Sequence, residues 1–446
     1  MERYTEYKDS GVQWLGKIPS HWDCMKLKAL CQMYGRIGFR GYSKDDLVDE
    51  GKGAITLGPS NFVDGELNFD KCSYLSWQKY YESPEIMVNN GDIVFVKTAS
   101  VGKVAIARSL PQETTVNPQI LVFKRIACNP FFLNYFLQSS KLQGWVIASA
   151  NGSTILTISQ VTIGDYPIFV PSKAEQDAIV RYLDAATAKI DTAIAKQQQM
   201  IDLLNERKQI IINNAVTKGL DSSVKMKDSG VDWIGQIPEH WEINKFRNLF
   251  KTRTGISFTK AQLEESGDPV ISYGQIHSKF NWGASVNPEL IRHIPSTITK
   301  DKDGALAFKG DFLFADTSED FEGCGNCVCV DTDEPIYAGS HTILAKKDND
   351  EIDAYLAYLF ASSRWRGQVR SMVNGVKVYS VTQTLLRSAV VLLPPRTEQI
   401  AIAEYIKKRV VLLNAAVQRC GEKIALLQER KQIIINDVVT GKVKVS

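Results

Sequence analysis

The stretch KDSGVQWLGKIPSHW at residues 8–22 returns almost unchanged as KDSGVDWIGQIPEHW at residues 227–241. A second motif, PSKAEQ at residues 171–176, returns as PPRTEQ at residues 394–399. Both pairs recur in the same order and at nearly the same spacing. A chain that repeats its landmarks in this way contains one structural unit twice. Two copies are too few for a solenoid, so we expect an internal pseudo-dimer.

The middle of each copy follows a shared outline but has its own contents. GDIVFVKT at residues 91–98 matches GDFLFADT at residues 310–317, and an Asn-Gly pair begins at both Asn151 and Asn374. Between these landmarks the two copies differ greatly. The chain is therefore a recurring frame around two divergent interiors.

The composition is that of a globular protein. Hydrophobic residues make up 44% and charged residues 23% of the 446 residues, and the formal net charge is +3. This mildly basic balance permits a nucleic-acid partner without requiring one. The N-terminal sequence has no apolar signal region, and the eight cysteines follow no disulfide framework. Both observations favour a cytoplasmic location.

The longest predicted helices lie at the end of each copy. Residues 175–216 contain no proline or glycine, so a helix of roughly 60 Å is expected at about 1.5 Å per residue. The motif LNERKQIIINNAVTKG at residues 204–219 closes this helix and returns as LQERKQIIINDVVTGK at residues 427–442. A narrow apolar seam with the alternating spacing of a coiled coil predicts that the two helices pair with each other.

The same seam occurs in both copies, which favours mutual pairing over packing of each helix on its own domain. Lys208 and Lys431 occupy one equivalent seam position. The predicted spacer coil comprises Leu183, Ile190, Ile194, Gln197, Ile201 and Leu204 in the first copy and Ile406, Leu413, Val417, Cys420, Ile424 and Leu427 in the second. We expect antiparallel helices, because each must return towards the other copy. Four tryptophans of the KDSGV motifs would then pack at the helix ends: Trp14, Trp22, Trp233 and Trp241.

The interiors are predicted to be α/β domains. Strand-like segments of the first copy lie at residues 53–61, 92–98, 104–108 and 119–126. Residues 130–146 and 351–369 form equivalent predicted helices late in each interior. Because strands dominate the middle, we expect curved, barrel-like mixed sheets. The fold class is thus α+β: two α/β domains, separated by two long antiparallel helices that form a coiled-coil spacer with an internal pseudo-twofold.

These motifs, taken together, make the whole chain resemble the specificity subunit of type I restriction-modification systems. The resemblance implies target recognition domains at residues 1–170 and 220–393, each reading one half of a bipartite, asymmetric DNA site. It implies spacer helices at residues 171–219 and 394–446 that fix the half-site distance and dock two methyltransferase subunits. Endonuclease subunits can join such an assembly. S-adenosylmethionine, ATP and Mg are then expected on the partner subunits and not on this chain.

DNA-contacting residues are expected on the unlike interiors, because Lys and Arg neutralise phosphates while Arg, Asn and Gln read base edges. The better candidates lie in two glycine-marked loops that both copies share, the loop after the GD strand and the Asn-Gly turn. In the first copy the candidates are Arg36, Arg40, Lys97, Thr98, Ser100, Lys103, Asn151 and Ser153. In the second copy they are Arg253, Lys260, Thr317, Ser318, Asn326, Asn374, Lys377 and Tyr379. Each of these residues, taken alone, is more typical of an ordinary solvated surface than of a DNA contact.

A self-sufficient methyltransferase is the main alternative, and a pure protein scaffold is a third. NPFF at residues 129–132 resembles the Asn-Pro-Pro-aromatic motif of adenine methyltransferases, but it lacks the second proline and has no equivalent in the other copy. We interpret it as a helix start with Pro130 in the first turn. The sequence has no P-loop, and the cysteines at 324, 327 and 329 lack a second pair for zinc. We therefore expect no catalytic site and no metal site.

Overall fold

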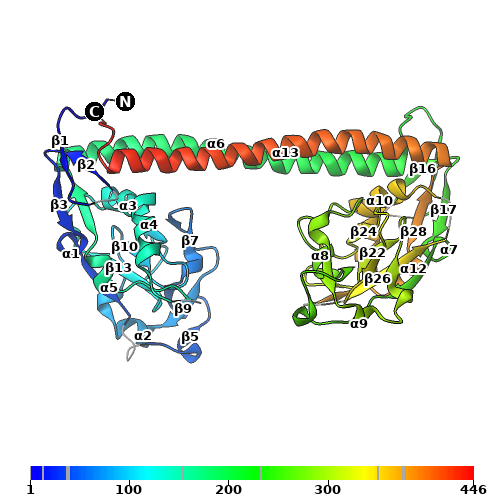
Figure 1. Ribbon diagram of the computed structural model, residues 1–446, viewed down its shortest axis with the longest axis horizontal. Coiled ribbons are helices and arrows are strands. Elements are labelled where there is room, and N and C mark those ends of the chain that lie inside the picture. The colour runs from blue at the N-terminus through cyan, green and yellow to red at the C-terminus, as the bar shows by residue number, and fades with distance from the viewer. Residues whose placement is uncertain are drawn as a thin grey trace. The chain divides into compact units, whose positions relative to one another are not determined.

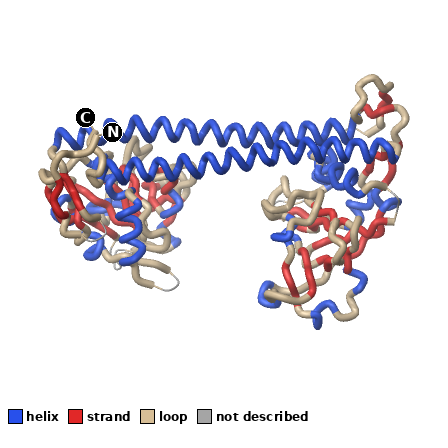
Figure 2. Tube along the Cα trace, turned by 45° about the horizontal axis from the view of Figure 1, so that its top comes forward, coloured by secondary structure: helices blue, strands red, loops and turns tan. Residues whose placement is uncertain are grey.

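The computed structural model describes residues 2–12, 15–36, 41–152, 155–231, 234–348, 351–373, 375 and 378–445. The chain divides into two compact units, Met1–Gln197 with Glu422–Ser446 and Gln198–Gly421. Each unit combines sheets and short helices with parts of two long helices (Figure 1, Figure 2). Within the described residues, no helix is both long enough and apolar enough to cross a membrane.

Two four-stranded sheets form the centre of the first unit. The antiparallel sheet has the order β11 (Val104–Ile106), β10 (Ile93–Val96), β13 (Ile120–Lys124) and β4 (Gln32–Gly35). The mixed sheet has the order β12 (Thr114–Val116), β6 (Gly53–Leu57), β9 (Ser73–Ser76) and β5 (Leu47–Val48). Strands β12 and β6 are parallel. Every residue of β6 and β10 is buried, as expected of strands covered on both faces.

The second unit repeats this arrangement with different residues. Its antiparallel sheet has the order β24 (Cys327–Cys329), β22 (Phe312–Ala315), β26 (Thr342–Lys347) and β18 (Phe250–Thr254). Its mixed sheet has the order β20 (Arg292–Ile294), β19 (Asp268–Ile271), β25 (Ile336–Ala338) and β21 (Leu306–Ala307). The strands β10 and β22, which carry the GD motif, occupy the same place in their sheets. The predicted duplication and the predicted mixed sheets are thus confirmed.

Smaller elements complete each unit. The short helices are α1 (Leu27–Leu30), α2 (Trp77–Tyr81), α5 (Gln160–Gly164), α7 (Phe246–Leu249), α8 (Tyr273–Ile276), α9 (Ser296–Thr299) and α12 (Gln383–Ser388). Strand β3 (Asp23–Lys26) pairs with β14 (Pro167–Val170), and β17 (Glu242–Lys245) pairs with β28 (Val390–Leu393). These two pairs close each interior immediately before a long helix begins.

Two helices, rather than the single one predicted, follow the sheets in each unit. They are α3 (Pro130–Gln138) and α4 (Ser140–Ser149) in the first unit and α10 (Asp353–Ala361) and α11 (Ser363–Met372) in the second. The breaks fall at Ser139 and Ser362, which have extended backbones and whose hydroxyls cap the second helix. Local capping therefore overrides the continuous apolar pattern. Pro130 does lie in the first turn of α3, and Asn129 caps that turn, so the NPFF motif starts a helix.

The long helices are α6 (Lys173–Lys218) and α13 (Arg396–Val439), and they run antiparallel within each unit (Figure 1). In the first unit Lys431 pairs with Asp191 at 2.7 Å. In the second unit Lys208, whose pKa is lowered by burial, donates to Asn414 Oδ1 at 3.2 Å. All twelve residues predicted for the seam are buried or half-buried, which confirms the coiled coil. The helix ends at Val439, and after it Lys444 forms an antiparallel β-bridge with Glu2 through the main chain.

The KDSGV motifs fold as hairpins that hold the start of the long helices. Their strands are β1 (Tyr7–Asp9), β2 (Lys17–Pro19), β15 (Met226–Asp228) and β16 (Gln236–Pro238). Each hairpin leads to a fully buried tryptophan, Trp22 or Trp241. The indole N–H groups donate to Glu175 Oε1 at 3.2 Å and to Glu398 Oε2 at 3.0 Å. The glutamate of each repeated P-x-x-x-E-Q motif therefore fastens a long helix to a hairpin.

The same tryptophans meet the end of the other long helix. A Cβ atom at Gly441 would lie 3.3 Å from the Trp22 ring, and one at Gly219 would lie 3.2 Å from the Trp241 ring. Both glycines have a positive φ, the left-handed conformation that commonly ends a helix. Glycine adopts this conformation at little energetic cost because it has no side chain. The predicted tryptophan joint at the helix ends is thus confirmed for these two residues. Trp14 and Trp233 lie outside the described residues.

The glutamine and asparagine of the repeated motifs attach each interior to the coil. Gln176 Oε1 accepts from the N–H of Asn129, at the start of α3, at 2.7 Å, and Gln399 repeats this at the start of α10. Asn436 Oδ1 accepts from the N–H of Ser140, at the start of α4, at 2.8 Å, and Asn213 repeats this at the start of α11. Because free N–H groups at a helix start need partners, these residues recur in both copies.

Removing the carboxylate of Glu175 is expected to destabilise the protein. Glu175→Ala leaves the Trp22 N–H and the Tyr4 hydroxyl, which donates at 2.6 Å, without their acceptor. The expected loss in the free energy of unfolding is about 1–3 kcal/mol. Urea denaturation followed by tryptophan fluorescence measures it. Glu206→Ala, at an exposed position on α6, is the control. Equal stability of both variants would contradict this role of Glu175.

Candidate nucleic-acid interface

The two loops predicted to contact DNA lie side by side in the first unit. The loop after β10 meets the segment after the Asn-Gly turn at a bridge between Thr98 and Thr157. The N–H of Ile158 donates to the carbonyl of Lys97 at 2.9 Å. Asn151 and Thr157 also exchange two main-chain hydrogen bonds of 2.8 Å. The main chain therefore joins segments far apart in the sequence into one loop surface.

The second unit joins the equivalent loops in the same way. Strand β23 (Thr317–Ser318) pairs with β27 (Tyr379–Ser380). The N–H of Val381 donates to the carbonyl of Asp316 at 2.8 Å. Phe321, in the longer loop of this unit, lies 5.5 Å from Tyr379, ring centre to ring centre. Each unit thus has one composite loop surface built from both predicted loops.

A glycine lets each loop pack against a helix of its own unit. Gly102 has a φ of +97°, and a Cβ atom there would lie 2.3 Å from Gln143 Oε1 on α4. Gly325 has a φ of +83°, and its Cβ atom would lie 3.3 Å from Val369 on α11. A larger residue would push the loop away from the helix. The glycines therefore set how closely each loop packs against its helix, α4 or α11.

Among the described residues, the loop surface of the first unit offers one charged group without a partner. Lys97 is half-buried, and its ammonium forms no hydrogen bond or ion pair among the described residues. Lys103 bends back towards two main-chain carbonyls around β7 (Phe62–Val63), at 3.3 and 3.4 Å. Ser100 and Asn151 are exposed, and Thr98 is half-buried. Lys97 is thus the group here most in need of an acceptor.

The loop surface of the second unit is a connected polar network. His277 Nε2 lies 2.8 Å from the carbonyl of Thr317, which can only accept, so Nε2 carries the proton. His277 Nδ1 then accepts from the amide of Asn326 at 3.1 Å. The hydroxyl of Thr317 donates to Asp316 Oδ1 at 2.7 Å, and His341 Nδ1 lies 3.3 Å from the same oxygen. This surface combines a carboxylate, an amide and two imidazoles.

Two of the residues predicted to contact DNA lie in the protein interior instead, so the prediction is wrong for them. Arg36 is only 5% exposed, and its guanidinium donates to the carbonyl of Val116 at 3.2 Å and to Thr115 Oγ1 at 3.4 Å. Ser318 is 2% exposed and donates to the carbonyl of Asp320. Both side chains stabilise the fold, because Arg36 joins the end of β4 to β12 and Ser318 binds the main chain of Asp320.

The remaining candidates either lie apart from the two loop surfaces or fall outside the described residues. Arg253 on β18 and Lys260 are exposed, and no described contact joins them to the network of the second unit. Four candidates lie outside the described residues: Arg40, Ser153, Asn374 and Lys377. Sequence reasoning missed Asp316, His277 and His341. Asp316 could have been found, because it aligns with Lys97 in the GD motif. The histidines follow no motif and meet the loop only through the fold.

The cysteines of the second unit behave as buried thiols. Cys327 and Cys329 lie on β24 and, like Cys324, belong to the hydrophobic core. Burial raises the pKa of Cys327 to about 12, which disfavours the thiolate that binds metals. Among the described residues, no group of three or more His, Cys, Asp or Glu side chains is placed to hold a metal ion.

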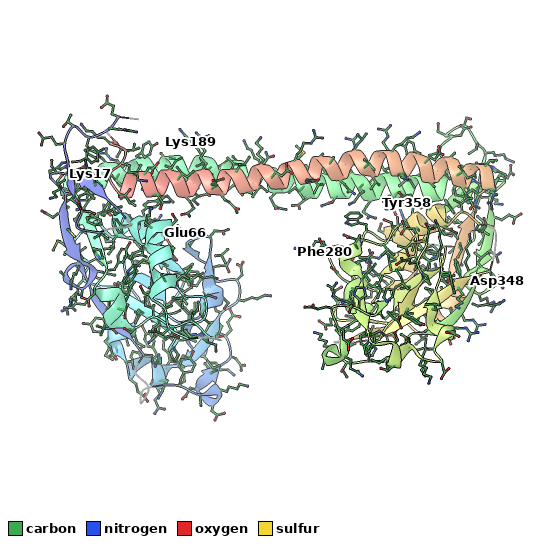
Figure 3. All side chains as sticks on the ribbon, viewed as in Figure 1. Lys17, Glu66, Lys189, Phe280, Asp348 and Tyr358 are labelled. Carbon is green, nitrogen blue, oxygen red and sulfur yellow. The ribbon has the colours of Figure 1, made fainter. Side chains whose placement is uncertain are left out.

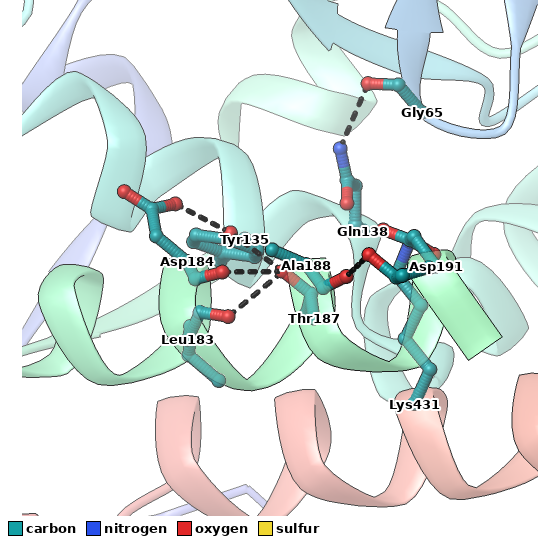
Figure 4. Close-up of polar contacts among 10 residues, drawn as sticks. Gly65, Tyr135, Gln138, Leu183, Asp184, Thr187, Ala188, Asp191 and Lys431 are labelled. Atoms are coloured by element: carbon teal, nitrogen blue, oxygen red, sulfur yellow. Dashed lines mark hydrogen bonds and ion pairs between the residues drawn. The ribbon is translucent and has the colours of Figure 1, made fainter.

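A cleft of about 870 Å³ in the first unit lies beneath the loop surface. It separates the helix pair from the β7 hairpin, whose second strand, β8 (Glu66–Leu67), carries Glu66 (Figure 3). Two side chains of α3 tie its walls together (Figure 4). Tyr135 donates to Asp184 on α6 at 2.6 Å, and Gln138 donates to the carbonyl of Gly65 at 3.1 Å. The first bond holds α3 on the long helix, and the second holds the β7 hairpin on α3.

Comparison with known families gives a match over most of the chain. A model described as type I restriction modification DNA specificity domain matches residues 19–201 and 238–415. A relative from Methanocaldococcus jannaschii, ascribed to the type I restriction enzyme MjaX as its specificity subunit, is 23% identical over 97% of this chain and 96% of its own. The specificity subunit of the type I restriction enzyme EcoKI from Escherichia coli K12 is 22% identical over 96% of this chain and 90% of its own.

A solved structure has the same fold. A chain described in connection with complex assembly and conformational transition of a type I R-M system matches with a TM-score of 0.65. The match covers 96% of this chain and 99% of that chain at 15% identity. At this identity the likeness concerns the fold alone. It includes both units and both long helices, since nearly the whole of each chain is aligned.

Proposed function

Because the chain belongs to the type I restriction modification DNA specificity family, we propose that it is the DNA sequence-specificity subunit of a type I restriction-modification complex. Each interior reads one half of a bipartite, asymmetric DNA site. The helices α6 and α13 set the distance between the half-sites and dock two methyltransferase subunits. The chain itself performs no catalysis.

The observation that carries this proposal is one frame with two unlike loop surfaces. The first surface presents Lys97 and the second presents Asp316, Asn326 and two histidines, although the same main-chain bonds position both. Surfaces with different donors and acceptors select different base pairs. Two such surfaces on a duplicated frame therefore suit a site whose halves differ in sequence.

The helices also carry apolar residues outside their seam. Leu426 and Ile433 on α13, in the first unit, are at least half exposed, and so are Leu203 and Ile210 on α6, in the second unit. These are equivalent positions of the repeat. Each pair lies two helical turns apart on one helix face, where it offers apolar surface that a partner subunit could cover. A pair in each copy supports docking of two like subunits, one on each pair.

The chemistry then belongs to the partners. S-adenosylmethionine is bound by the methyltransferase subunits, and ATP and Mg are bound by endonuclease subunits when these join the complex. The complex acts in the cytoplasm, where the host DNA lies.

Methylation mapping tests the proposal. The purified chain is combined with the methyltransferase subunits of its host, S-adenosylmethionine and a random DNA library. We expect methylation at one bipartite sequence with the complete mixture and none when either component is missing. Methyl transfer by the chain alone would instead favour a self-sufficient enzyme. Methylation without sequence preference by the complete mixture would contradict the role in specificity.

Replacing one of these apolar pairs with aspartates is expected to release one methyltransferase subunit. The change Leu426→Asp with Ile433→Asp removes the exposed apolar surface of the first unit while leaving the seam intact. We expect the affinity for one of the two subunits to fall by at least about tenfold, from the cost of burying an unpaired charge. Mass photometry measures the stoichiometry. Ala415→Asp, exposed on α13, is the control. Retention of both subunits by the double variant would contradict the docking site.

A further inference from the structure

One position of the repeated frame carries opposite charges in the two units. The N–H of Lys97 donates to the carbonyl of Gln119 at 2.8 Å, and the N–H of Asp316 donates to the carbonyl of His341 at 3.1 Å. The carbonyls of Lys97 and Asp316 accept from the segments after the two Asn-Gly turns, as described above. Both residues therefore have the same two main-chain neighbours. The structure makes Lys97 and Asp316 equivalent in space within their units, and Gln119 equivalent to His341.

The side chains around Lys97 differ from those around Asp316, in keeping with the opposite charges of these two residues. Lys97 has no anionic partner among the described residues, and its ammonium would lie 3.7 Å from a Cβ atom at Gly35 on β4. Asp316 accepts from Thr317 and lies beside His341, whose backbone has a φ of +55°. A non-glycine residue with positive φ is strained and is held in place by its surroundings. The first unit thus presents donors at this position, whereas the second presents a carboxylate.

The reversed charge indicates what the position faces. A lysine could contact either a phosphate or a base edge, but a carboxylate beside a phosphate would be repelled. If both units present the same loop surface to DNA, a position shared by Lys97 and Asp316 must face base edges rather than the phosphodiester backbone. The bases offer both acceptors, such as O6 and N7 of guanine, and donors, such as the N4 amino group of cytosine.

We propose that Lys97 and Asp316 are equivalent specificity-determining residues that set one base pair in each half-site. Lys97 donates to the acceptor edge of a guanine in the first half-site. Asp316, oriented by Thr317 and His341, accepts from the amino group of a cytosine in the second. This inference rests on the proposed function. It adds the two residues that decide whether a hydrogen-bond acceptor or a donor on a base is recognised in each half-site.

The test uses the full chain in complex with its methyltransferase subunits and a library covering every base at each position. Lys97→Gln replaces an ammonium with an amide, which pairs best with adenine. We expect one position of the first half-site to shift from guanine towards adenine by about ten- to a hundredfold in relative methylation. Asp316→Asn should relax one position of the second half-site by a similar factor. Neither change should affect the other half-site.

Lys189→Gln on α6 is the matched control, because it makes the same substitution at an exposed helix position (Figure 3). Thermal unfolding confirms that each variant is folded. A phosphate contact of Lys97 would instead weaken binding to all sequences alike and lower the salt slope by about one, which would overturn the inference. Unchanged base preference in both variants would overturn it too. Loss of sequence preference in the unmodified complex would count against the proposed function, not against this assignment.

Discussion

Replacing residues 26–165 with the interior of another family member is expected to change the first DNA half-site completely and leave the second unchanged. The two exchange points lie close together, because β3 ends at Lys26, and Lys26 pairs with Pro167 at the start of β14. Lys28 and Lys26 lie 2.8 and 3.0 Å from Asp165 across this junction and lower the pKa of its carboxyl. The donor interior should therefore also provide these charges. Methylation mapping of the hybrid complex measures both half-sites.

The hybrid must also keep the attachments to the coil. A donor without proline at positions 129 and 140 preserves the main-chain bonds to Gln176 and Asn436, and a serine at position 140 also preserves the bond that the Asn436 amide donates to its hydroxyl. A second hybrid that exchanges the equivalent interior of the second unit serves as the reciprocal control. If either exchange altered both half-sites together, the two interiors would not read independently, and the modular function would be wrong.

Inserting two residues after Gln197 is expected to abolish assembly, whereas inserting four is expected to lengthen the unread gap in the DNA site. Two residues turn α6 by about 200°, which moves the apolar seam to the solvent side. Four residues turn it by about 400°, so the seam is only about 40° out of phase and nearly re-forms. They add about 6 Å, or roughly one or two base pairs.

A target library with gaps of every length measures the effect. We expect the half-site sequences to stay the same in the four-residue variant while the preferred gap increases. A companion variant with four residues after both Gln197 and Cys420 lengthens the two helices equally and separates the effect of length from that of mismatch. An active four-residue variant that kept the original gap would show that these helices do not set the spacing.

The frame was predictable from the sequence because its contacts lie inside the repeated motifs. Trp22 with Glu175, and Trp241 with Glu398, use residues that both copies share, and the coil seam follows from periodicity alone. The break between α3 and α4 was not predictable. The apolar pattern continues through Ser139, and a cap of about 1 kcal/mol decides where the chain turns.

The loop surfaces were predictable as segments but not as side chains. The shared glycines located the loops, and the pairing of Thr98 with Thr157 brings them together. The direction of a side chain depends on how the sheets pack, which no local pattern contains. Arg36 therefore turned out to be internal, and His277 joined the network from a helix end that no motif marks.

The paired attachment by asparagine has a genetic consequence. Asn436 receives the start of α4 and Asn213 receives the start of α11 with the same amide chemistry, and neither side chain touches a residue proposed to read bases. The frame of the other copy therefore offers an interior the same amide attachment as its own frame does. Recombination between the duplicated stretches of the gene could make the two interiors trade places. The product would be a protein that reads the same two half-sites in the opposite order, and so a new target gained in one step.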